Sequence, residues 1–161
     1  MRTELEHARE RAEAMIGTRE TRELGTVRPA ESVAFAVAAA ETDARFLDPQ
    51  HPEFAIHPMY LPSLLRGPQG GFDREYRADG MFRDEVPGTD GIDVRLMAGG
   101  QSVTFLLPAP LGEDVVVGRV LDTVTTKGRA PDEFLLLSVT KTYRGAQSGA
   151  FAEVVEKFIV R

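Results

Sequence analysis

Apolar residues recur along the chain with two different periods, which divide it into a helical first part and a stranded second part. In residues 4–15 the apolar positions fall on one stripe at helical spacing, and the other face carries Glu and Arg. Pro29 suits the first turn of a second helix, and the run 33–40 is apolar almost all round. We therefore predict a docked surface helix and then a central buried helix over residues 29 to about 46.

The middle of the chain has no clear period. Residues 48–91 are rich in Pro and Gly, with a short helix predicted at residues 63–66. Residues 67–90 form a long polar stretch with many turn signals. Loops of that length are usually functional lids or mobile loops, so we predict such a loop here.

Strand patterns dominate the last third of the chain. Alternating and β-branched apolar residues predict four strands, at residues 102–107, 115–126, 134–144 and 151–160. The resulting order is helix, short strand, buried helix, long loop and antiparallel meander. This order predicts an α+β architecture, in which a curved antiparallel sheet wraps around the central helix. Open sheet edges often pair with a second copy, so we also expect a dimer.

Length and composition predict one soluble domain. The 161 residues fit a single domain, residues 1–161, with residues 1–17 as an N-terminal helical extension. No apolar run is long enough to span a bilayer, so no membrane contact is expected. The N-terminus is too charged for a secretory signal, and we predict a cytoplasmic location.

Charge and missing motifs exclude several function classes. The chain has no Cys, which excludes disulfides, thiolate nucleophiles and cysteine-ligated metals. A net charge of −6 opposes nucleic-acid backbones, so no nucleic-acid partner is expected. The few His residues lack the spacing of a metal site, and none is predicted. There is also no phosphate-binding glycine loop, dinucleotide fingerprint or nucleophile elbow.

Several short motifs occur in the order of a known family. Residues 99–114, GGQSVTFLLPAPLGED, are similar to the G-G-Q-x-F-x-x-P-L-x-x-G-D segment that begins the sheet of MaoC-like and FAS1-like dehydratase domains. Residues 27–40 resemble the leading strand and central helix of that family, and residues 56–59 resemble its A-H-P/G-M segment. The resemblance covers residues 17–161 and implies the hot-dog fold, in which a curved antiparallel sheet wraps around a helix.

The resemblance also implies an activity. Family members hydrate enoyl thioesters or dehydrate 3-hydroxyacyl thioesters, carried by coenzyme A or an acyl-carrier protein, through the Asp and His of a D-x-N-P-x-H signature. The matching residues here are Asp43-Ala44-Arg45-Phe46-Leu47-Asp48, so Asp43 is kept and Asp48 replaces the His. The reaction moves only protons and water, so no cofactor is expected.

The resemblance makes Asp43 the first catalytic candidate, and His57 is the candidate for the missing imidazole. Asp48 and His51 are weaker candidates, because each fits an ordinary turn residue beside a proline. The alternatives for Asp43 and His57 are a carboxylate near a helix end and a loop histidine bonded to the backbone. The residues predicted to contact substrate are Arg45, Met59, Tyr60, Gly99 and Gly100.

Three functional hypotheses follow. The first is a hydratase or dehydratase of acyl thioesters that uses Asp43 and His57. The second is a non-catalytic hot-dog subunit that binds the acyl chain for a catalytic partner, because the His of the signature is lost at Asp48. The third is a repurposed enzyme of specialised metabolism that performs a cyclisation or another addition. A homodimer fits the first and third hypotheses, and a heterodimer with another hot-dog subunit fits the second.

Overall fold

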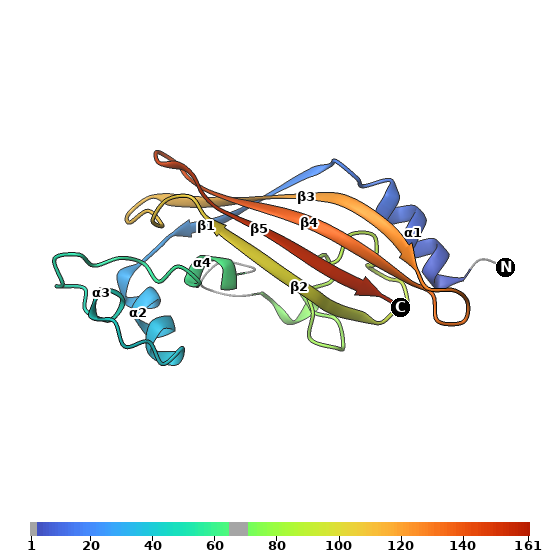
Figure 1. The fold of residues 1–161 in the computed structure, drawn as a ribbon, viewed down its shortest axis with the longest axis horizontal. Coiled ribbons are helices and arrows are strands. Elements are labelled where there is room, and N and C mark those ends of the chain that lie inside the picture. Colours follow the sequence, from blue (N-terminus) through green and yellow to red (C-terminus); the bar gives the residue numbers. More distant parts are fainter. Residues whose placement is uncertain (1–2, 65–70) are drawn as a thin grey trace.

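The first helix is the one that the sequence predicts. A computed structural model describes residues 3–64 and 71–161 (Figure 1). In it α1 spans Glu4–Glu13, two residues shorter than predicted. Thr3 caps α1: its hydroxyl accepts the Glu6 N–H at 3.2 Å, and the Glu6 carboxylate accepts the Thr3 N–H at 2.8 Å. Ala8 and Ala12 are its buried residues, so α1 docks through small side chains.

One five-stranded sheet organises the described part of the chain. Its strand order is β1-β3-β4-β5-β2, and every neighbouring pair is antiparallel. The α+β class and the antiparallel meander are thereby confirmed. β1 is highly charged and lies earlier in the chain than the predicted leading strand. The strands are β1 (Arg19–Thr26), β2 (Leu96–Phe105), β3 (Asp114–Lys127), β4 (Phe134–Gly145) and β5 (Gly149–Val160).

Strand alternation produces one buried face. Along β4, every second residue from Leu135 to Tyr143 is buried. Register brings Val117 of β3 and Ala152 of β5 to either side of Tyr143, so the three strands share this face. Two hydrophobic clusters lie on it, one beneath α1 and one near the start of β5.

The predicted central helix is wrong in length and in burial. α2 spans Pro29–Ala38 and ends where Ala40 adopts a φ of 55°, and a separate short helix, α3, spans Ala44–Leu47. Only Ser32 and Ala36 of α2 are buried, and Val37 is 64% exposed. Figure 1 shows α2 and α3 beside one end of the sheet rather than enclosed by it. A stripe of alanines offers little area to bury, so α2 gains little free energy from packing against the sheet.

Part of the predicted long loop packs onto the sheet. Residues 84–89, called the strap below, lie under β3 and β4, and Glu85 to Thr89 are buried. The interpretation of this stretch as a lid therefore does not hold for the strap. A one-turn helix, η1, spans Asp73–Glu75, and residues 67–70 lie outside the described residues.

The remaining helix also differs from the prediction. α4 spans Tyr60–Ser63, where the sequence predicts a helix at residues 63–66. Of that predicted range, residues 65–66 lie outside the described residues. Within residues 3–64 and 71–161, no helix is long and apolar enough to cross a membrane.

Charged side chains hold the strap to the sheet. Lys141 Nζ lies 2.9 Å from Glu85 Oε1 and 2.7 Å from Glu156 Oε2. Arg119 donates to the backbone carbonyls of Asp84, at 3.1 Å, and of Glu85, at 2.6 Å. Lys141 and Arg119 are 3% and 2% exposed, so these contacts are shielded from water. We call Lys141, Glu85, Glu156 and Arg119 the ionic cluster.

Candidate functional site

An apolar pocket of about 410 Å³ opens where the loop before α4 meets the end of β2 and the start of β5. Among the described residues, none of its lining side chains is titratable. Phe105, Leu106 and Leu107 are 47%, 54% and 51% exposed, so this wall is open to solvent. The lining residues are Phe46, Ala55, Ile56, Pro58, Phe105, Leu106, Leu107, Pro108, Ala109, Phe151 and Ala152.

His57 lies next to the pocket without lining it. Its neighbours Ile56 and Pro58 line the pocket. The His57 ring packs instead between Phe35 and Phe46, with ring centroids 5.2 and 5.4 Å away. Its backbone N–H donates to Ser32 Oγ at 3.0 Å, which ties this loop to α2. The Phe46 ring thus separates the imidazole from the apolar cavity.

The partner of His57 is Glu41, which the sequence analysis missed. His57 Nδ1 accepts the Met59 N–H at 3.2 Å, so the proton of the neutral ring belongs on Nε2. Nε2 lies 3.5 Å from Glu41 Oε2. Glu41 Oε1 accepts the N–H groups of Asp43 at 2.9 Å and Thr42 at 2.6 Å, and these bonds lower the pKa of Glu41. The available signal was a carboxylate placed directly after a helix end.

Asp43 is engaged by Arg45 and not by His57. Asp43 is the N-cap of α3, where its Oδ1 accepts the Arg45 N–H at 2.9 Å. The Arg45 guanidinium also forks onto the carboxylate, with Nη2 2.6 Å and Nε 3.0 Å from Oδ2. These bonds lower the pKa of Asp43 and keep it ionised. The same guanidinium lies 5.6 Å from the centre of the Phe46 ring, at the pocket rim.

The weaker catalytic candidates make local turn contacts. Asp48 Oδ1 accepts the Gln50 N–H at 2.9 Å, and His51 Nδ1 accepts the Glu53 N–H at 3.1 Å. Neither side chain lines the pocket. Within the described residues, no group of three His, Asp or Glu side chains is arranged to hold a metal ion.

Of the other residues predicted to contact substrate, Tyr60 lies on α4, whereas Gly99 and Gly100 lie on β2. Tyr60 is 5% exposed, and its hydroxyl lies 3.3 Å from Glu31 Oε2. Burial, and after it the Glu31 carboxylate, raises the pKa of Tyr60 to about 12. Gly99 and Gly100 lie at a bulge of β2 opposite Lys157. The pocket meets β2 only at its last residue, Phe105, so the structure does not bring the two glycines to it.

Comparisons with known proteins bear on the fold. No protein-family model matches the chain, and no curated protein matches it by sequence. Among solved structures, it is similar to a chain of the ChsH1–ChsH2 complex from Mycobacterium tuberculosis, with a TM-score of 0.67 and 15% identity over 96% of this chain and 89% of that one.

Two further solved structures agree. The MaoC-like dehydratase from Rhodospirillum rubrum has a TM-score of 0.61 and 15% identity over 90% of this chain and 91% of that one. The (R)-hydratase from A. caviae involved in PHA biosynthesis has a TM-score of 0.59 and 18% identity over 89% and 94%. The chain therefore has the hot-dog fold of MaoC-like proteins, as the sequence motifs predict. At such identities the likeness concerns the fold alone.

Proposed function

We propose that this chain is the acyl-binding subunit of a hydratase or dehydratase of 2-enoyl or 3-hydroxyacyl thioesters, and that a second hot-dog chain supplies the acid and the base. The observation that carries the proposal is the pocket of about 410 Å³, whose lining within residues 3–64 and 71–161 is entirely apolar. Its size lies within the roughly 300–1,000 Å³ of small-molecule sites. Such a lining suits an acyl chain and offers no group for proton transfer.

The chemistry requires both an acid and a base. Hydration joins the water oxygen to C3 of the enoyl group while C2 gains a proton, and dehydration reverses both steps. A positioned acid or base contributes about 10²–10⁴-fold each. Asp43 is held ionised by Arg45, and both ring nitrogens of His57 face partners of the same chain. The described part of this chain therefore presents no such pair to the pocket.

The charges on the two edge strands of the sheet support the proposal of a partner chain. β1, at one edge, carries Arg19, Glu20, Arg22 and Glu23, and charges of this kind discourage pairing with another strand. β2, at the other edge, has ten residues and none is charged. Its last residue, Phe105, lines the pocket, so a strand docked on β2 would bring a second chain beside the acyl site. The similar ChsH1–ChsH2 structure is itself a complex.

A second candidate function is a hydratase that needs no partner. The observation in its favour is the His57–Glu41 pair, in which Nε2 lies 3.5 Å from Oε2 beside a ring that lines the pocket. In that reading Glu41 orients the imidazole, and Phe46 has to move for His57 to reach C2 or C3 of the substrate. His57 also has to release the Met59 N–H.

Binding and turnover by the purified chain test the proposal. We expect calorimetry to detect binding of the octanoyl thioester of N-acetylcysteamine, and we expect no hydration of 2-octenoyl-CoA above the buffer rate. Ala55→Trp fills the pocket and should weaken binding at least about tenfold, roughly 1.4 kcal/mol. Ala78→Trp, at an exposed position outside the pocket, is the matched control.

Each contrary outcome has a clear meaning. Absence of binding to a folded chain, or equal binding by Ala55→Trp, would overturn the proposal that the pocket holds the acyl group. Turnover by the chain alone that disappears in His57→Ala and falls in Glu41→Gln would support the second candidate. Melting temperatures of the variants show whether the fold is intact.

A further inference from the structure

Carboxylates are in excess around the pocket, and this excess bears on which part of an acyl thioester the chain contacts. Residues 28–58, of which four line the pocket, contain five carboxylates and two arginines. Residues 105–114, of which the first five line the pocket, add two carboxylates and no cation. With His neutral these segments carry a charge of −5, out of −6 for the whole chain.

Both arginines of residues 28–58 already face carboxylates. The Arg45 guanidinium lies 2.6 Å from Asp43 Oδ2 and makes a bidentate contact. Arg28 Nη1 lies 4.0 Å from Glu31 Oε1 at the start of α2. A phosphate would have to compete with these carboxylates for either cation.

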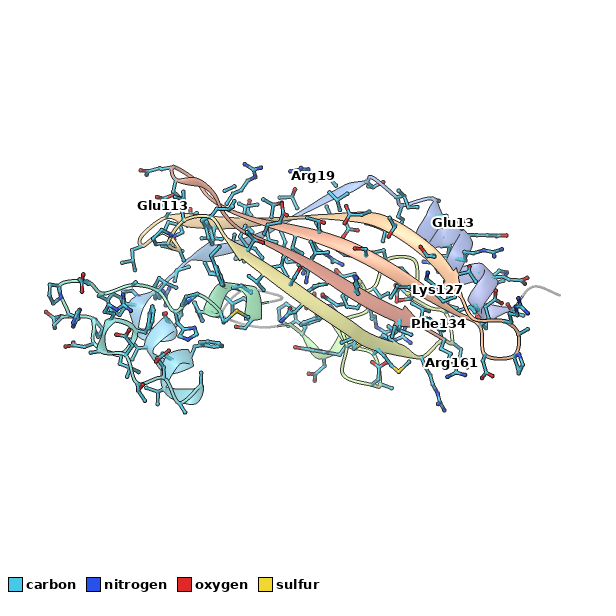
Figure 2. The ribbon with its side chains drawn as sticks, in the orientation of Figure 1. Glu13, Arg19, Glu113, Lys127, Phe134 and Arg161 are labelled. Atoms are coloured by element: carbon cyan, nitrogen blue, oxygen red, sulfur yellow. The ribbon has the colours of Figure 1, made fainter. Side chains whose placement is uncertain are left out.

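The lysines lie elsewhere. Figure 2 shows Lys127 beside Phe134 and Arg161 at one end of the sheet, with Glu113 at the other end. Lys141 is buried in the ionic cluster. Lys157, on β5, lies opposite Gly100 of β2 and Ser138 of β4 and is not among the residues that line the pocket. Within the described residues, therefore, no lysine lines the pocket.

We infer that the chain binds the acyl end of its ligand through apolar contacts and leaves the phosphates of coenzyme A, or of a phosphopantetheine carrier, to the partner. The inference rests on the proposed function. Phosphate sites in proteins use Arg, Lys or free N–H groups at a helix N-terminus, whereas the first turn of α2 carries Glu31. A negative rim repels a polyanionic carrier, and salt screens that repulsion.

A matched pair of ligands tests the inference. Octanoyl-CoA and the octanoyl thioester of N-acetylcysteamine share the acyl thioester, but only the first carries phosphates. We expect the uncharged thioester to bind at least as tightly in calorimetry. Raising ionic strength from about 0.01 M to about 0.15 M shortens the screening length from roughly 30 to 8 Å. It should tighten octanoyl-CoA binding about two- to fivefold and leave the uncharged ligand nearly unchanged.

The outcomes separate this inference from the proposed function. Failure of both thioesters to bind would overturn the acyl-binding function itself. Octanoyl-CoA that binds tenfold more tightly than the uncharged thioester, or that weakens as salt rises, would overturn only the inference. Arg45→Met supplies a second test: we expect unchanged or tighter octanoyl-CoA binding, and a severalfold loss confined to octanoyl-CoA would show that Arg45 holds a phosphate.

Discussion

The two hydrophobic clusters on the buried face of the sheet are covered in different ways. At the strap end, α1 and the strap close the sheet, and Val86, Leu121 and Val139 are at most 3% exposed. At the pocket end, Leu24, Tyr60 and Tyr143 are buried, yet a cavity of about 410 Å³ stays open beside them. Apolar surface left open in this way is typical of ligand or partner sites. The strap end thus serves stability, and the pocket end is the site where we propose that the acyl group binds.

Charge is distributed differently at the two ends as well. The ionic cluster lies at the strap end, where the side chains of Lys141, Glu85 and Glu156 are mostly shielded from water. At the pocket end Asp43 and Arg45 are 35% and 51% exposed at their side chains, where an ion pair stabilises a protein little. Substitutions of charged residues should therefore destabilise the protein far more at the strap than at the pocket.

The largest effect is expected from Lys141→Met. It removes the ammonium shared by Glu85 and Glu156 and leaves buried carboxylates without a counter-charge. We expect the free energy of unfolding to fall by about 3–5 kcal/mol in urea denaturation. Lys157→Met, at an exposed position of β5, should change it by less than about 0.5 kcal/mol. Equal effects of the two substitutions would contradict a stabilising role for the ionic cluster.

The next effect is expected from Gly88→Ala in the strap. Gly88 has a φ of 82°, and a Cβ there would lie 2.6 Å from the Ala12 backbone nitrogen of α1. Left-handed strain and the clash should together destabilise the protein by about 2–5 kcal/mol. Gly91→Ala is the matched control, because Gly91 has a φ of 73° but open space around it. Its cost should be only about 1–2 kcal/mol. Similar melting temperatures for the two variants would show that α1 does not depend on this close approach.

The smallest effect is expected at the pocket end, from Tyr60→Phe. At neutral pH it removes one hydrogen bond to Glu31, worth about 0.5–1.5 kcal/mol. Because the pKa of Tyr60 is raised to about 12, the folded chain keeps this phenol protonated after the unfolded chain has ionised. Stability should therefore fall as pH rises from about 10 to 12.

Tyr60→Phe should lose this part of the alkaline decline, while Tyr76→Phe should keep it. Denaturation at two alkaline pH values measures the difference, and ultraviolet titration reports the phenol directly. A Tyr60 phenol that titrates near the ordinary pKa of tyrosine would show that the pocket end is more hydrated than its burial in the structure implies.

The sequence by itself determined β3, β4, β5 and α1, whereas β1 lies earlier in the chain than predicted. Alternating apolar residues mark β3, β4 and β5, because a half-buried strand needs one apolar face, and an apolar stripe at helical spacing marks α1. The motif in residues 99–114 also indicates the fold family. Local patterns of this kind reflect interactions within a few residues or between neighbouring strands, so they are readable along the chain.

Only the tertiary structure decided what covers the sheet and where the charged side chains point. The alanine run of α2 predicts a buried helix, but α1 and the strap cover the sheet. Lys141 and Arg119 hold the strap in place by binding residues 34 to 56 positions away in the chain. Likewise His57 is a catalytic candidate in the sequence, but its pairing with Glu41 depends on the loop packing back against α2, where the His57 N–H donates to Ser32. Contacts between residues distant in the chain produce no periodic pattern in the sequence, so they cannot be predicted from it. Those contacts shape the pocket and its rim.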